Sequence, residues 1–214
     1  MPFPDSPDRF LLYAITDRQA LPGRDPGPFL RRAVGAGVDL VQVREKDLAD
    51  GDLFALARLA VESARGSGTK ILINDRLDVA IAAEADGVHL GGHSAPADAV
   101  RAVAPEGFII GVSTHSLQEA GKAAGAEADF ITFGPVFHTP SKARYGPPLG
   151  TGALREACEA VELPVLPLGG INRENFPQLL GLPVAGLAAI SLFQGAPDLE
   201  ELVRLIRSAA EGSR

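Results

Sequence analysis

The sequence is short of several features that mark specialised classes of protein. Its 214 residues include one cysteine, Cys158, which excludes an internal disulfide and predicts a reducing compartment, the cytoplasm. No stretch approaches the ~20 consecutive apolar residues that a membrane-spanning helix needs. Residues 1–9 contain three prolines and no apolar core, so they do not resemble a secretory signal.

An excess of positive charge is also lacking. The formal net charge is −7 and the isoelectric point is near 5.1, which argues against nucleic acid or an anionic membrane as the main partner. A phosphorylated small molecule remains compatible, because a few local cations suffice to bind it. The length predicts one domain, 1–214, with 1–10 as an N-terminal extension, and a homo-oligomer is compatible with it.

Short apolar runs alternate with segments of helical spacing. Strands are expected at 11–16, 40–44, 70–74, 87–90, 109–113, 130–135, 165–169 and 186–190. Helices are expected at 28–36, 53–65, 95–103, 117–124, 153–161, 173–180 and 199–210. This alternation is typical of parallel βαβ units in an α/β protein.

Eight such units favour a closed (β/α)₈ TIM barrel over an open, doubly wound sheet. An open sheet usually has a Gly-rich phosphate loop after its first strand. Here the first strand runs into Thr16, Asp17 and Arg18 instead. The catalytic face of a barrel is built from the C-terminal ends of its strands, and unusual polar residues gather at those ends.

The second expected strand ends in two cations. Alternation places Gln42, Arg44 and, if the strand continues, Lys46 on the lumen side. Buried cations need anionic partners, so the pattern predicts either a phosphate or diphosphate site or a structural salt bridge with Glu45 or a neighbouring acid. After the third strand, Asp75 either binds Mg²⁺ together with substrate phosphates or caps the next helix.

Later strand ends carry further candidates. Ser113 is a hydrogen-bond donor or the start of a helix cap, and His115 is either an acid/base group or, as a single unsupported histidine more often is, a structural residue. The loop after the sixth strand holds Thr139, Ser141 and Lys142, which together suggest an anion site. The seventh strand runs into Gly169 and Gly170 and the eighth into Ile190 and Ser191, where barrels often bind phosphate through backbone N–H groups.

Cys158 lies in an expected helix and is interpreted as a small apolar residue rather than a nucleophile. His89 and His93 straddle a strand end and two glycines, and no HExxH pattern occurs, so no transition metal is expected.

Seven motifs in order make the sequence resemble the thiamine phosphate synthase family, with its sister branch of TenI-like thiazole tautomerases. They are QVREK (42–46), INDR (73–76), GVHLG (87–91), GVSTH (111–115), GPVFHTPSK (134–142), LGGI (168–171) and AIS (189–191). The similarity runs from residue 12 to about residue 205.

The resemblance implies a transferase that condenses hydroxymethylpyrimidine diphosphate with a thiazole phosphate, giving thiamine phosphate and pyrophosphate. Asp75 would bind Mg²⁺. By the same resemblance, the pyrimidine diphosphate would be held by Gln42, Arg44, Lys46, Asn74, Ser113 and Lys142. The thiazole phosphate would be held by Thr139, Ser141, Gly170, Ile190 and Ser191.

One position departs from the family pattern. Ser94 stands where synthases carry an acidic residue as second Mg²⁺ ligand, which is expected to weaken the metal site. Tautomerases also lack that carboxylate, so an isomerase that uses His115 is the alternative. The intact cations, with Asn74 and Asp75, favour the synthase. A non-catalytic barrel that binds thiamine-pathway intermediates is the third hypothesis.

Overall fold

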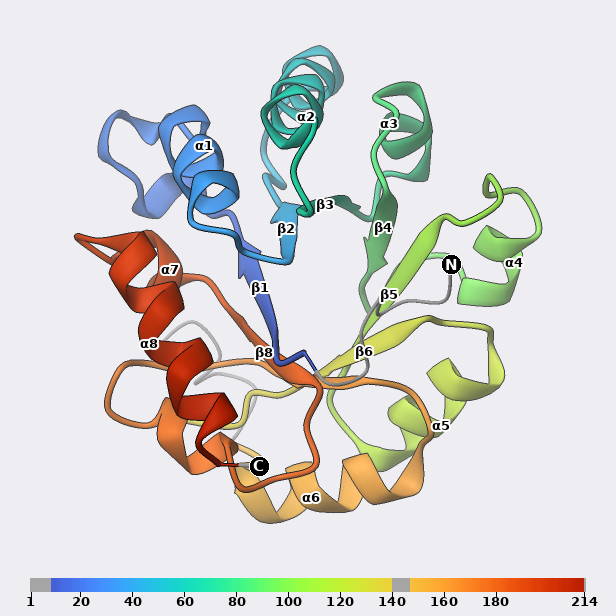
Figure 1. Ribbon diagram of the computed structural model, residues 1–214. Helices are drawn as coiled ribbons and strands as arrows, with labels where there is room; N and C mark the ends of the chain where they lie inside the picture. The colour runs from blue at the N-terminus through green and yellow to red at the C-terminus, as the bar shows by residue number, and fades with distance from the viewer. Residues whose placement is uncertain (1–8, 140–146, 214) are drawn as a thin grey trace.

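The protein is a barrel of parallel strands enclosed by a ring of helices, seen in a computed structural model that describes residues 9–139 and 147–213 (Figure 1). The strands are β1 Leu11–Ile15, β2 Leu40–Val43, β3 Lys70–Asn74, β4 Gly87–Leu90, β5 Ile109–Thr114, β6 Phe130–Phe133, β7 Val165–Pro167 and β8 Gly186–Ala189. They pair in chain order from β1 to β7, and β8 pairs with β1. A parallel bridge between Leu168 and Ala188 closes the circle. The predicted (β/α)₈ barrel is confirmed.

The helices are amphipathic and lie outside the strands. They are α1 Gly27–Gly35, α2 Asp50–Ala64, α3 Leu77–Ala82, α4 Ala97–Arg101, α5 Leu117–Gly125, α6 Gly150–Ala160, α7 Ser191–Gln194 and α8 Leu199–Glu211. In α8, buried Leu199, Leu202 and Ile206 recur at helical spacing and face the barrel. Within 9–139 and 147–213, no helix has the length and apolarity to cross a membrane.

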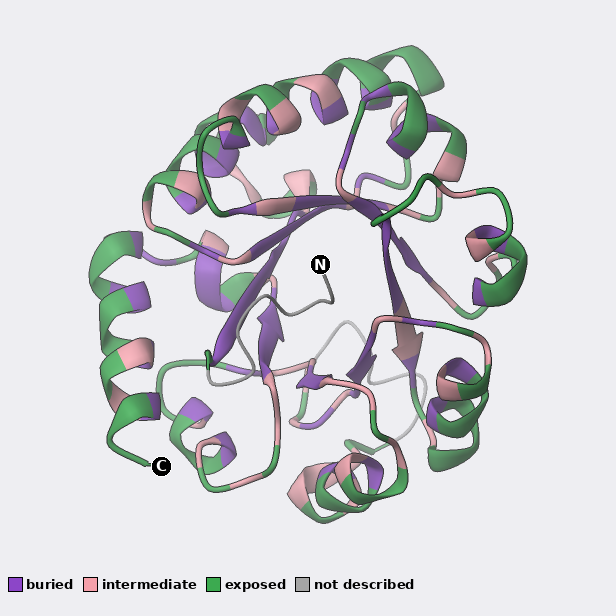
Figure 2. Ribbon diagram, turned by 45° about the vertical axis from the view of Figure 1, so that its right-hand side comes forward, coloured by how far each residue is buried: buried purple, intermediate pink, exposed green. Residues whose placement is uncertain are grey.

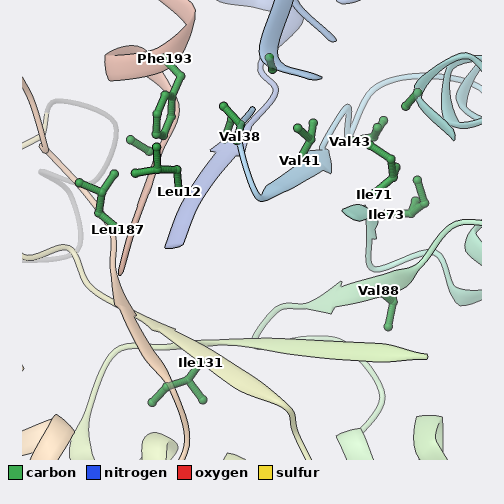
Figure 3. Close-up of a cluster of buried hydrophobic side chains, with 14 of the residues drawn as sticks. Leu12, Val38, Val41, Val43, Ile71, Ile73, Val88, Ile131, Leu187 and Phe193 are labelled. Atoms are coloured by element: carbon green, nitrogen blue, oxygen red, sulfur yellow. The ribbon is translucent and has the colours of Figure 1, made fainter. Parts of the chain in front are cut away.

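Both faces of the strands are buried, in two separate apolar clusters (Figure 2). The outer cluster, between strands and helices, includes Leu12, Ile71 and Ile131 (Figure 3). The inner cluster fills the lumen with Leu11, Tyr13, Leu40, Leu72, Phe130 and Leu166. Alternate residues of one strand therefore belong to different cores, which explains the continuous apolar runs in the sequence.

Some predicted elements differ from the structure. The expected helix 173–180 is only a 3₁₀ turn, η4 Phe176–Leu179. Pro177 supplies no backbone N–H there, and Asn172 Oδ1 accepts from the N–H groups of Glu174 and Asn175 at 2.9 and 3.0 Å, which holds a turn in place of the first helical bonds. The short helices α3 and α7 were not expected.

Candidate active site

The predicted site residues that the structure describes lie at or just beneath one end of the barrel, which we call the mouth. Because all strands are parallel, their C-terminal ends open on the same side. Arg44 follows β2, Asp75 follows β3 and Ser113 lies near the end of β5. Gly170 follows β7, and Ser191 opens the helix after β8.

Arg44 is a half-buried cation without an ion pair among the described residues. Its backbone N–H donates to Thr16 Oγ1 at 2.9 Å, which ends the strand. Glu45 turns away and accepts from the backbone N–H of Arg18 at 3.0 and 3.2 Å. Burial raises the pKa of Glu45. The alternative of a structural salt bridge between Arg44 and Glu45 is therefore wrong.

Lys46 does not continue the inward row. The strand stops at Val43, and Lys46 lies exposed in the following turn. Its inward placement was expected only if the second strand continued, and that condition is not met, because alternation applies only while the chain remains extended. Ser141 and Lys142, the other predicted anion-binding residues of the sixth loop, lie outside the described residues.

Asp75 and Ser94 lie together at the mouth, on the loops after β3 and β4. The Ser94 hydroxyl donates a hydrogen bond to Asp75 Oδ1, and Asn74 Nδ2 approaches Oδ2 at 3.5 Å. Asp75 has a φ of 65° and does not cap α3, whose N-cap position is occupied by Arg76. The capping alternative for Asp75 is therefore wrong.

These oxygen donors fit a magnesium ion of the kind that binds with substrate. Mg²⁺ in proteins often takes one or two carboxylates, and waters and substrate phosphates complete its shell. Asp75 is exposed and offers its carboxylate, with the Ser94 hydroxyl beside it. Among the described residues, no group of three His, Cys, Asp or Glu side chains forms a complete protein cage.

A polar network lies beneath the mouth, within the lumen. Gln42 Nε2 donates to the Tyr13 hydroxyl at 2.7 Å, and that hydroxyl lies 3.1 Å from His89 Nδ1. His89 Nε2 lies 2.9 Å from Ser113 Oγ. Burial, followed by the charge of Arg44, lowers the pKa of His89 to about 3, although Asp75 opposes the shift. Sequence reasoning missed Tyr13 and His89, although both occupy inward positions of their strands, as Gln42 does.

Ser113 and His115, two predicted site residues near the end of β5, differ in exposure. Ser113 is half-buried within the strand, and it is Ser116 that caps α5 by accepting from Glu119 N at 3.2 Å. The capping alternative for Ser113 is therefore wrong. His115 is exposed, and its Nδ1 lies 2.5 Å from the Gly134 carbonyl oxygen.

The mouth also brings together the residues expected to hold a second phosphate. Gly170 has a φ of 67°, and its carbonyl accepts from Asn175 Nδ2 at 2.8 Å. Ile190 is the N-cap of α7 and Ser191 is its first residue. Thr139 is half-buried at the end of the first described segment.

Cys158 and His93 lie away from this chemistry. Cys158 is half-buried on α6 against the outer core, and burial raises its thiol pKa to about 11, as fits a packing role. His93 is exposed, while both ring nitrogens of His89 contact hydroxyls in the lumen.

The chain is similar to known proteins over nearly its whole length. A relative from Geobacter sulfurreducens is 45% identical over 197 residues, covering 92% of each chain. A thiamine-phosphate synthase from Roseiflexus castenholzii is 38% identical over 210 residues, 98% of this chain and 91% of the other. The solved thiamine phosphate pyrophosphorylase of Pyrococcus furiosus has a TM-score of 0.84 at 33% identity, and covers 96% of this chain and 98% of its own. The profile of the family described as thiamine monophosphate synthase matches residues 12–193, and this chain belongs to that family.

Proposed function

We propose that the protein is a thiamine-phosphate synthase. It would join hydroxymethylpyrimidine diphosphate to a thiazole phosphate, breaking the C–O bond to the diphosphate and forming a C–N bond to the thiazole. The main observation is that Arg44, a cation without an ion pair among the described residues, and Asp75 follow the neighbouring strands β2 and β3 at the mouth of a barrel of this family. The relatives named thiamine-phosphate synthase support the same reaction.

Diphosphate departure is the step that the cationic side of the mouth would assist. Arg44 would hold the diphosphate oxygens through its forked N–H groups, with Asn74, Lys46 and Lys142 as further donors. Developing negative charge on the leaving group is stabilised best by donors that are already in place. Arg44 is anchored through its backbone bond to Thr16, so its approach to the leaving group is partly pre-set.

Asp75 would hold Mg²⁺, with Ser94 as a neutral neighbour. The ion would supply charge neutralisation of the diphosphate as it leaves. With one carboxylate at the site, metal affinity would depend strongly on the substrate diphosphate.

The thiazole phosphate would bind on the opposite side of the mouth. Gly170, Ile190 and Ser191 lie at the ends of β7 and β8, where barrels commonly bind phosphate through backbone N–H groups. Thr139 and Ser141 would add hydroxyl donors. This arrangement would place the thiazole nitrogen across from the pyrimidine, so that orientation contributes to the rate.

The test is thiamine phosphate formation by purified protein with both substrates over a range of Mg²⁺ concentrations. We expect Mg²⁺-dependent product. No product, with substrates verified on an authentic synthase, would reject the proposal.

One observation supports a second candidate, thiazole tautomerisation. His115 is exposed at the end of β5, and its bond to the Gly134 carbonyl oxygen fixes the ring, leaving Nε2 for proton transfer. Tautomer turnover that is lost in His115→Gln, without thiamine phosphate formation, would favour this function. Tight pyrimidine diphosphate binding with neither turnover would favour a regulatory barrel.

A further inference from the structure

A continuous chain of hydrogen bonds connects the buried interior of the barrel to its mouth. It runs from Gln42 through Tyr13 and His89 to Ser113, with steps of 2.7, 3.1 and 2.9 Å. Tyr13, Gln42 and His89 are 0, 1 and 2% exposed, whereas Ser113 is half-buried at the mouth. Protons in the buried part therefore cannot be rearranged by contact with bulk water.

The direction of the chain follows from its donors. The amide nitrogen of Gln42 only donates, so the Tyr13 oxygen accepts and its own proton points to Nδ1 of His89. A neutral imidazole whose Nδ1 accepts carries its proton on Nε2. Nε2 then donates to Ser113, and the Ser113 hydroxyl proton is left for a ligand.

Packing holds the middle of the chain in place. The ring centroid of His89 lies 5.6 Å from that of Tyr13 and 5.7 Å from that of Phe130, and Phe130 meets Tyr13 edge-on. A Cβ atom added at Gly111 would lie 2.6 Å from His89 Nδ1, so the glycine makes room for the ring. Among the described residues, the polar atoms of both rings contact only each other and neutral groups, namely the Gln42 amide and the hydroxyls of Ser113 and Thr132.

The two ends of this hydrogen-bond chain have opposite hydrogen-bonding roles. Within residues 9–139 and 147–213, no donor reaches Gln42 Oε1 and no acceptor takes the Ser113 proton. The hydrogen-bond chain thus presents a free acceptor, Gln42 Oε1, at one end and a free donor, the Ser113 hydroxyl, at the other. A 4-aminopyrimidine has the complementary edge, an amino donor next to a ring-nitrogen acceptor. Its 4-oxo counterpart has these two functions reversed.

We propose that Tyr13 and His89 are positioning residues that fix the hydrogen-bond polarity of Gln42 and Ser113, so that the site accepts a 4-aminopyrimidine and rejects its 4-oxo counterpart. This inference rests on the proposed function, in which Gln42 and Ser113 hold the pyrimidine. Neither Tyr13 nor His89 needs to touch the ligand.

The test measures the ratio of dissociation constants for two unphosphorylated probes, by calorimetry. They are 4-amino-5-hydroxymethyl-2-methylpyrimidine and its 4-oxo counterpart. We expect the wild type to prefer the amino probe by about 100-fold, and Tyr13→Phe to lose about tenfold of that preference. The matched control is Thr132→Val, which also deletes a buried hydroxyl. Thr132 Oγ1 lies 3.5 Å from His89 Nε2, to the side of the hydrogen-bond chain. The ratio of dissociation constants in Thr132→Val should therefore equal that of the wild type.

Two results would overturn the proposal: a wild-type ratio in Tyr13→Phe, or an equal loss in Thr132→Val. If Tyr13→Phe does not fold, His89→Gln and His89→Leu replace it. The amide of Gln supplies one acceptor and one donor, so it should keep more of the ratio than Leu does. Equal ratios in those two variants would also reject the positioning role.

Thiamine phosphate formation by the wild type, measured in parallel, separates this inference from the proposed function. No product with an intact amino preference rejects the synthase and leaves the positioning role standing. Product formation without any amino preference rejects the positioning role and leaves the synthase standing.

Discussion

Ser94 donates a hydrogen bond to the Asp75 carboxylate, joining the loop after β4 to the residue that follows β3. A neutral hydroxyl therefore lies against the carboxylate that is proposed to bind Mg²⁺. Ser94 Oγ also accepts from the backbone N–H of Gly91 at 2.6 Å, a bond that an Asp carboxylate can replace.

Ser94→Asp is expected to tighten Mg²⁺ binding. A second carboxylate raises the charge of the site, so the apparent Mg²⁺ activation constant should fall about tenfold. Without metal, the two carboxylates repel each other, so the melting temperature should drop in EDTA and recover with Mg²⁺. Ser94→Asn is the neutral control. If Asp and Asn behave alike in both measurements, Ser94 does not adjoin the metal.

Arg44→Ala is expected to reduce synthase turnover by about 10²–10³-fold, with little change in melting temperature. Its side chain has no ion pair among the described residues, so the fold does not depend on its charge. Arg65→Ala, which removes an exposed cation paired with Glu62 on α2, should keep wild-type kinetics. Kinetics near wild type in Arg44→Ala would reject the diphosphate assignment. Lys142→Ala, tested in the same way, should also lose turnover.

Gly170→Ala is expected to lower the free energy of unfolding by about 1–3 kcal/mol. A Cβ atom there would lie 2.4 Å from the His138 carbonyl oxygen, and the φ of 67° is strained for alanine. The KM for the thiazole phosphate should rise as well. Gly152→Ala, on α6 with open space around its Cβ position, is the control and should be neutral or stabilising. Equal urea denaturation midpoints for both variants would contradict this expectation.

Stability should fall with acid through His89. The unfolded chain protonates this histidine near its ordinary pKa of 6.5, whereas the folded pKa is about 3. The unfolded state thus binds more protons in that window, and stability present above pH 6.5 is lost as the pH falls, by up to about 1.4 kcal/mol per pH unit. Urea unfolding at several pH values should show a flatter profile for His89→Gln than for His93→Gln. Identical profiles would show that His89 is not the group responsible.

Cys158 is expected to react slowly with iodoacetamide in the native protein at pH 8. Its thiol pKa of about 11 leaves little thiolate. The same reaction in urea should be much faster, and mass spectrometry follows both. Rapid native alkylation would show that the thiol is activated.

The sequence predicted most of the strands and helices because hydrophobic periodicity reports burial directly. β3 and β4 have the predicted bounds. β3 is an apolar run between Lys70 and Asn74, and β4 lies between Asp86 and Gly91. The expected helix 173–180 failed because Pro177 and the Asn172 side chain act locally against helical bonds. The short α7, only four residues long, carries too little periodicity to be detected.

The contacts within the candidate site were predicted less completely than the strands and helices. Arg44, Asp75 and Ser113 could be named as candidates because polar residues at strand ends stand out in a barrel. Lys46 was expected to point inward only if the second strand continued, and the sequence pattern did not show that the strand ends at Val43.

The sequence by itself determined the barrel, its family and the residue types that converge at the mouth, because periodicity and motifs are local properties of the chain. Only the tertiary structure decided which polar groups meet. It set Tyr13, Gln42 and His89, from three different strands, into one buried chain, and placed Ser94 against Asp75. Such contacts depend on strand stagger and loop direction, which are set when the barrel closes.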